Sequence, residues 1–185
     1  MDGFAFDDLV VGQTARLAKT ITEADILLFA AVSLDTNPVH MDAEAAAESV
    51  FKERVAHGML SAGLISAVLG TKLPGAGTVY LGQTLRFRAP VKIGDTVVAI
   101  AEVTALDPVR KRATLKTTCS VRGKLVIDGE ATVMPRSAPP AAPSGATVPG
   151  APGAPGAPGA PGAPGAPGAP GTPGTPGTPG TRSPA

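Results

Sequence analysis

Alternation of apolar and polar residues predicts one strand near the start of the chain and several long strands in its second half. The first strand is predicted over residues 13–21. The later strands are predicted over residues 79–91, 96–106, 112–122 and 124–134. These runs exceed the usual length of a strand, which is typical of a strongly curved sheet.

Two helices are predicted between the first strand and residue 51. Thr22 is placed as the N-cap of a helix that ends near Asp35, because Pro38 disfavours helical geometry at the residue before it. A short helix is predicted over residues 43–50. The connector that follows, residues 51–55, has no clear pattern.

Residues 58–72 have no polar face at any helical phase. A helix of a water-soluble domain that is apolar all round must be buried, so we predict a buried central helix here. Its small side chains leave room for other backbone segments to approach closely. Pro74 and the glycines after it end the helix.

Short turns separate the long strands, which predicts that consecutive strands lie side by side in an antiparallel meander. A curved antiparallel sheet and one apolar helix combine most simply when the sheet wraps around the helix. That arrangement is the hot-dog fold, of the α+β class. One side of so small a sheet would stay open, and an exposed edge pairs readily with another chain. We therefore expect a homodimer.

Composition divides the chain into a domain, residues 1–137, and a low-complexity tail, residues 138–185, rich in Pro, Gly and Ala. Gly150 begins ten Gly-Ala-Pro or Gly-Thr-Pro triplets with the spacing of collagen. The tail is either one strand of a triple helix or an extended segment without a partner. We favour the disordered, extended form, because ten triplets are few and a trimeric tail does not match a dimeric domain.

Charge and cysteine content exclude several classes of protein. The 16 basic and 15 acidic residues nearly balance, which gives no indication of binding to nucleic acid or to an anionic membrane surface. Cys119 is the only cysteine, so an internal disulfide and a cysteine metal cluster are excluded. The longest apolar run, residues 60–70, is too short to span a bilayer, and no apolar signal segment is seen at the start. We expect a cytoplasmic protein.

The most informative local feature is a carboxylate and an imidazole, Asp35 and His40, on either side of an Asn-Pro turn. Asp35 falls at the C-terminus of a predicted helix, where the macrodipole disfavours negative charge. Such local conflicts are typical of functional sites. The alternative is that Asp35 and Asn37 are ordinary turn residues whose side chains bond their own backbone.

An acid/base pair of this kind positions and activates a water molecule. Gly58 begins the predicted central helix, and backbone N–H groups at a helix start stabilise negative charge on a carbonyl oxygen. Together these groups suit the addition of water across a double bond conjugated to a thioester.

Four segments carry a resemblance to a known family, and they are residues 33–40, 55–60, 80–83 and 87–95. They resemble the MaoC-like (R)-specific enoyl-CoA hydratases, also called hydratase 2. The likeness extends over about residues 4–135, and the Asp-x-Asn-Pro-x-His element is its most specific part. The chain is most similar to the short bacterial enzymes that supply monomers for polyhydroxyalkanoate synthesis.

The resemblance implies that Asp35 and His40 are the catalytic pair, with Asn37 in support, and that the Gly58 N–H binds the thioester oxygen. It implies a trans-2-enoyl-CoA substrate, an (R)-3-hydroxyacyl-CoA product, and no metal or redox cofactor. We expect His57 to shape the site at the helix start without acting as a second base.

Two positions depart from the family: Leu34 replaces the usual Gly before the catalytic Asp, and Gly63 replaces a frequent Ser. Arg86 and Arg88 either contact the CoA phosphates or form a solvated strand face. Three other functions stay open on the sequence. They are a dehydratase acting on 3-hydroxyacyl chains of an acyl carrier protein, a hot-dog thioesterase, and a non-catalytic module.

Overall fold

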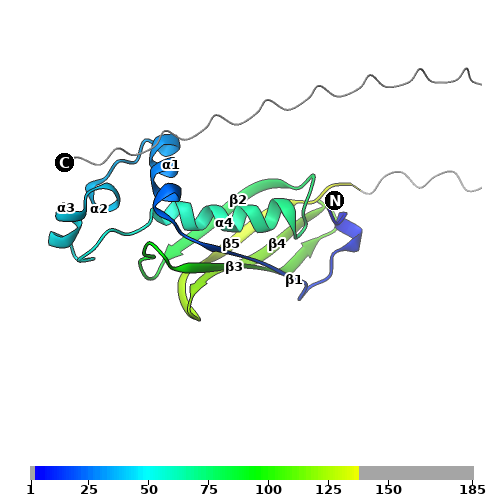
Figure 1. Ribbon diagram of the computed structural model, residues 1–185. Helices are drawn as coiled ribbons and strands as arrows, with labels where there is room; N and C mark the ends of the chain where they lie inside the picture. Colours follow the sequence, from blue (N-terminus) through cyan, green and yellow to red (C-terminus); the bar gives the residue numbers. More distant parts are fainter. Residues whose placement is uncertain (1–2, 138–185) are drawn as a thin grey trace, which may run out of the picture. The chain divides into compact units, whose positions relative to one another are not determined.

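The computed structural model describes residues 3–137, in which an antiparallel sheet curves around one long helix (Figure 1). The elements in chain order are η1 (Phe6–Asp8), β1 (Thr14–Thr20), α1 (Glu23–Ser33), α2 (Pro38–Met41), α3 (Ala43–Glu48), α4 (Gly58–Thr71), β2 (Val79–Phe87), β3 (Thr96–Asp107), β4 (Arg112–Val121) and β5 (Lys124–Met134). This confirms the predicted hot-dog fold of the α+β class.

The five strands follow the order β1-β3-β4-β5-β2, and every pairing is antiparallel. The meander is confirmed for β3 to β5, but its first step is wrong, because β2 pairs with β5 and not with β3. The segment between β2 and β3 is engaged elsewhere and cannot form a hairpin turn. Val91 O accepts from the Ala56 N–H, and the Gly94 N–H donates to Ile21 O.

Helix α4 packs against the sheet with Ile65, Val68 and Leu69, all at most 1% exposed. The predicted central helix is confirmed, but its complete burial is wrong for a single protomer. Met59 and three small residues of α4 stay exposed, and they recur at helical spacing on one face. We call this face the small-residue stripe, and it consists of Met59, Gly63, Ser66 and Gly70.

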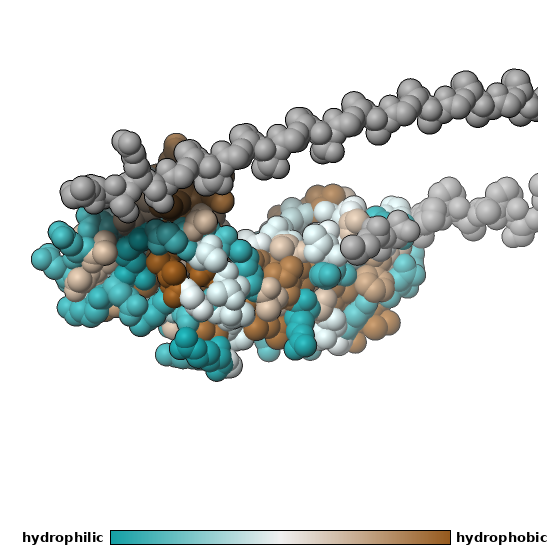
Figure 2. Space-filling model, in the orientation of Figure 1, coloured by the Kyte–Doolittle hydropathy of each residue, from teal (hydrophilic) through white to brown (hydrophobic). Residues whose placement is uncertain are grey.

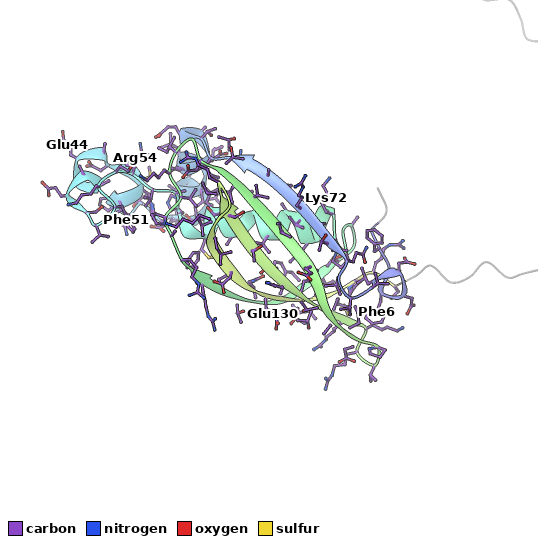
Figure 3. All side chains as sticks on the ribbon, turned by 90° about the horizontal axis from the view of Figure 1, so that it is seen from below. Phe6, Glu44, Phe51, Arg54, Lys72 and Glu130 are labelled. Atoms are coloured by element: carbon purple, nitrogen blue, oxygen red, sulfur yellow. The ribbon has the colours of Figure 1, made fainter. Side chains whose placement is uncertain are left out.

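The surface differs between the two ends of the domain. Figure 2 shows mostly hydrophilic surface at the end that carries α2 and α3, and more apolar surface over the rest. Arg54 and Phe51 lie near Glu44 at the first end, whereas Phe6 lies at the opposite one (Figure 3). No helix within residues 3–137 is long and apolar enough to cross a membrane.

Helix α1 begins and ends where its sequence predicts. The Thr22 hydroxyl accepts from the Asp25 N–H at 3.3 Å, and the Asp25 carboxylate accepts from the Thr22 N–H at 2.8 Å. Hydrogen bonds from the Thr22 backbone and hydroxyl, together with Lys19, lower the pKa of Asp25. At the other end, Leu34 adopts a left-handed conformation with φ of 61°.

The predicted Asn-Pro turn is in fact the start of a short helix, α2, which carries His40. Pro38 occupies its first position, where the missing N–H costs nothing, and the Asn37 side chain accepts from the Val39 N–H. The sequence therefore indicates the break after α1 correctly but misses this single helical turn. Asp42 then caps α3 through the N–H groups of residues 44 and 45.

The predicted collagen-like tail, residues 138–185, lies outside the described residues. The boundary at residue 137 therefore stays a prediction. Cys119 is buried in β4, as expected for a small core residue, and burial raises the pKa of its thiol to about 11.

Leu34→Gly is expected to raise the free energy of unfolding by up to about 1.5 kcal/mol. A left-handed conformation costs a residue with a Cβ roughly 1–2 kcal/mol, which glycine avoids. Glycine also has more freedom in the unfolded chain, and this lowers the gain in stability by about 0.4–1 kcal/mol. The Leu34 side chain is 82% exposed, so little buried apolar contact is lost. Urea denaturation measures the change.

Leu34→Ala is the control, because alanine removes the same exposed side chain but keeps the left-handed strain. A Gly variant no more stable than the Ala variant contradicts this account.

Candidate active site

A cavity of about 670 Å³ opens at the end of the domain where α4 begins. Its walls come from α1, α2, the first residues of α4 and the segment after β2. Six of the seven residues that the sequence singles out line it, and these are Asp35, Asn37, His40, His57, Gly58 and Arg88. Arg86 is not among the lining residues.

A backbone contact fixes the tautomer of neutral His40. Its Nδ1 lies 2.8 Å from Val55 O, and a carbonyl oxygen only accepts hydrogen bonds, so Nδ1 carries the proton. In neutral His40 the lone pair is therefore on Nε2. This is the tautomer that a general base needs.

His57 is 1% exposed and packs between two rings of the cavity wall. Its ring centroid lies 3.9 Å from that of His40 and 4.9 Å from that of Phe29. Its Nε2 donates to Asp35 O at 2.9 Å. His57 thus joins the start of α4 to the backbone that carries the candidate carboxylate.

The Asp35 carboxylate accepts a turn hydrogen bond and is also exposed to the cavity. One oxygen accepts from the Asn37 N–H at 3.2 Å, which is the turn bond that the alternative interpretation expects. A carboxylate has further lone pairs, and Asp35 is exposed to the cavity.

One oxygen of Asp35 and one ring nitrogen each of His40 and His57 lie within 4.8 Å of one another. A single water molecule spans such a gap at ordinary hydrogen-bond distances of about 2.8 Å to each side.

Gly58 is the first residue of α4. The N–H groups of Leu60 and Ser61 donate to His57 O, and the Gly58 N–H ahead of them has no acceptor within the helix. It is therefore available to a ligand at the positive end of the helix dipole. A Cβ on Gly58 would lie 2.7 Å from the Phe87 ring, so this contact requires glycine.

Arg88 reaches the cavity wall while paired with Asp128 of β5. Its Nε lies 2.5 Å and its Nη2 lies 3.2 Å from the two carboxylate oxygens. This contact raises the pKa of Arg88 and lowers that of Asp128. Arg86 is exposed on β2 directly opposite Asp128, so both arginines neighbour this carboxylate but only Arg88 lines the cavity.

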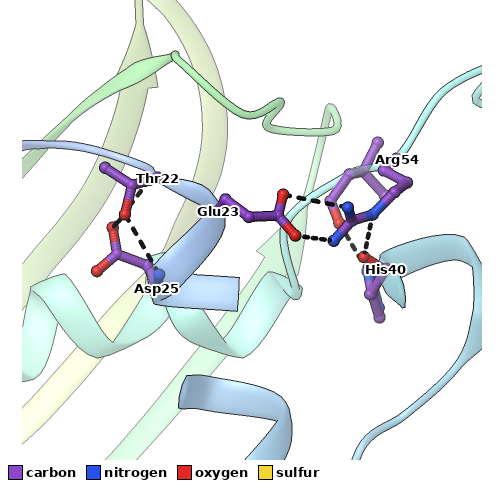
Figure 4. Close-up of polar contacts among 6 residues, drawn as sticks. Thr22, Glu23, Asp25, His40 and Arg54 are labelled. Atoms are coloured by element: carbon purple, nitrogen blue, oxygen red, sulfur yellow. Dashed lines mark hydrogen bonds and ion pairs between the residues drawn. The ribbon is translucent and has the colours of Figure 1, made fainter. Parts of the chain in front are cut away.

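Arg54 is a site residue that sequence reasoning missed. Its Nε donates to His40 O at 2.7 Å, and its guanidinium contacts both oxygens of Glu23 at 2.9 and 3.1 Å (Figure 4). The side chain is only 17% exposed. It fastens α2 to the start of α1 from a connector that shows no pattern in the sequence.

Comparison with known proteins assigns this chain to a family. The family model described as "MaoC like domain" matches residues 10–126. An (R)-specific enoyl-CoA hydratase of Rhodospirillum rubrum is 61% identical, over 70% of this chain and 90% of the relative. A 3-hydroxybutyryl-CoA dehydratase of Methylorubrum extorquens is 54% identical, over 69% of this chain and 82% of the relative.

A solved structure has the same fold. The unliganded R-hydratase PhaJ1 of Pseudomonas aeruginosa superimposes with a TM-score of 0.70 at 50% identity. The match covers 74% of this chain and 88% of that one.

Arg54→Met is expected to lower the free energy of unfolding by about 1–3 kcal/mol, because it leaves the His40 carbonyl and the Glu23 carboxylate without their charged donor. The loss should be local as well, so amide hydrogen exchange in residues 36–42 should accelerate. Denaturation and exchange mass spectrometry measure the two effects.

Arg110→Met is the matched control. Arg110 pairs with Asp107 in an exposed turn, where such changes stay within about 0.5 kcal/mol. Unchanged exchange in residues 36–42 of the Arg54 variant would show that Arg54 does not hold α2.

Proposed function

Because the chain belongs to the MaoC-like family, we propose that it hydrates a trans-2-enoyl-CoA to the (R)-3-hydroxyacyl-CoA and catalyses the reverse dehydration. The relatives named for these reactions, at 61% and 54% identity, support the substrate class. The observation that carries the proposal is the meeting of Asp35, His40 and the Gly58 N–H in one cavity.

In this proposal a water molecule is held between the Asp35 carboxylate and His40 Nε2. As its oxygen bonds to the β-carbon, one proton passes to this pair, and the double-bond electrons move toward the thioester oxygen. The Gly58 N–H stabilises the negative charge that develops there. The protonated member of the pair then gives its proton to the α-carbon, on the same face of the substrate.

The backbone contacts keep the pair ready for this exchange. The bond to Val55 O fixes the proton of neutral His40 on Nδ1, which leaves Nε2 for the water. The Asn37 N–H donates to the Asp35 carboxylate and His57 Nε2 donates to the Asp35 carbonyl, so the side chain and the backbone of Asp35 are both held in place. Such preorganisation lowers the barrier because no group has to reorient during the reaction.

We also propose that the working form is a homodimer joined at β2. This strand is an edge of the sheet, and its apolar residues Val79, Leu81 and Phe87 are exposed in the protomer. The small-residue stripe of α4 lies on a helix that packs against the same strand. Pairing with the β2 strand of a second protomer would give the unpaired backbone groups of this edge hydrogen-bond partners. It would also bring the small-residue stripes of the two protomers together.

The dimer proposal bears on the active site, since β2 ends at Phe87, whose ring lines the cavity. An interface at β2 therefore lies beside the entrance that the CoA portion of the substrate would use. Arg88, which follows Phe87 at this entrance, is the better placed of the two arginines to meet a CoA phosphate. The cytoplasmic location and the pathway served stay predictions.

Asp35→Asn and His40→Gln are each expected to lower kcat/KM for crotonyl-CoA hydration by about 10²–10⁴-fold, because each removes one member of the proton-transfer pair. Loss of the conjugated absorbance measures turnover, and chiral chromatography should identify an (R) product from the wild-type protein.

Glu48→Gln, the same type of change on the exposed face of α3, should leave the rate unchanged. Wild-type rates in either site variant, or an (S) product, would overturn the assignment. Release of free thiol without hydration would indicate a thioesterase. Faster turnover on carrier-protein thioesters would indicate the dehydratase alternative.

The dimer can be tested with Gly63→Glu. A Cβ at Gly63 meets no atom within 4 Å in the protomer, so the variant should fold, while a charge in the stripe should oppose association. We expect sedimentation to show a dimer for the wild type and for Gly63→Ala, and a monomer for Gly63→Glu at micromolar concentration. A monomeric wild type, or a dimeric Glu variant, contradicts this interface.

A further inference from the structure

The two histidines of the chain, His40 and His57, lie together in the cavity beside a carboxylate. One ligand atom from each of His40, His57 and Asp35 lies within 4.8 Å of the other two. Two imidazoles and a carboxylate suit zinc and its neighbours among the transition metals, whereas Mg²⁺ and Ca²⁺ prefer oxygen ligands.

The hydrogen bonds of both rings favour metal binding. Each ring donates one N–H to a backbone carbonyl, His40 Nδ1 to Val55 O and His57 Nε2 to Asp35 O. Metal-binding histidines usually hold their second nitrogen in this way, which fixes the tautomer and strengthens the free nitrogen as a ligand. Both rings therefore keep a lone pair available in their neutral forms.

The free nitrogen of His57 is an unusual group in its own right. Nδ1 is buried and has no hydrogen-bond partner among the described residues. Buried polar atoms are nearly always bonded, so an unpaired nitrogen on a residue that lines a cavity is a candidate ligand atom. The proposed hydration mechanism uses His40 Nε2 and gives this nitrogen no task.

We propose that Asp35, His40 and His57 bind a divalent transition metal such as Zn²⁺, and that the bound ion reversibly inhibits hydration. The ion would take the lone pair of His40 and displace the water from between the pair. In a tetrahedral zinc site the ligand atoms lie about 3.4 Å apart, so the carboxylate must approach the rings and the two stacked imidazoles must turn toward the ion. The Asp35 side chain is exposed and can follow, at the cost of its hydrogen bond from the Asn37 N–H.

Competing ligands are few, which makes the site testable. The chain has no other histidine, and its one cysteine, Cys119, is buried with a thiol pKa of about 11, so it stays protonated at neutral pH. Metal binding does not depend on the proposed function, but the inhibition does.

The first experiment titrates EDTA-treated full-length protein with Zn²⁺ by calorimetry, and with Co²⁺ by visible absorption. We expect one site per protomer, with tetrahedral Co²⁺ bands. His57→Gln and Asp35→Asn should each weaken binding at least 10-fold, and Glu48→Gln should not change it. An affinity for Zn²⁺ that these two variants leave unchanged, or no binding at all, overturns the proposal.

The second experiment adds Zn²⁺ to the hydration assay. The rate should fall as the site fills and return when EDTA is added, and Mg²⁺ at the same concentration should have no effect. Full activity of the zinc-loaded protein would overturn the inhibition. A protein that binds zinc but never hydrates would refute the proposed function and leave the metal site standing. A protein that hydrates but binds no zinc would refute the metal site and leave the proposed function standing.

Discussion

The hydrogen bond from His57 Nε2 to the Asp35 carbonyl joins two parts of the molecule that the rest of the site depends on. His57 belongs to the start of α4, which the sheet surrounds, whereas Asp35 follows an exposed helix end. Through this bond the main chain at Asp35 is held by a buried side chain of the core. Because the acceptor is a main-chain atom, the side chain of Asp35 is left to meet a ligand.

Much of the fold could be predicted from local pattern. The apolar run of α4, the Thr22 cap and the alternation in the long strands each depend on neighbours in the chain, and each is found as expected. Two of the failures have a common cause. Pairing of β2 with β5, and the exposed stripe of α4, depend on contacts between segments far apart, which no local pattern encodes.

In the candidate site, too, local sequence predicts some features and distant contacts set the others. The Asp-x-Asn-Pro-x-His spacing places Asp35 and His40 near each other, because one short turn and one helical turn separate them. Arg54 was missed because its acceptors lie in α1 and α2, and nothing in the connector distinguishes it from a solvated arginine. The tautomer of neutral His40 was also beyond the sequence, since it is set by the carbonyl of Val55, fifteen positions away.

The place of β2 in the sheet has a consequence for how the domain is assembled. β2 precedes β3, β4 and β5 in the chain, yet its neighbour is the last of them. The wall that Phe87 gives to the cavity therefore lacks its strand partner until β5 has been synthesised and has added to the sheet. Long-range pairing of this kind makes folding slow. A protein cut short within β5 would lose one side of its active site, even though every catalytic candidate lies in the first half of the domain.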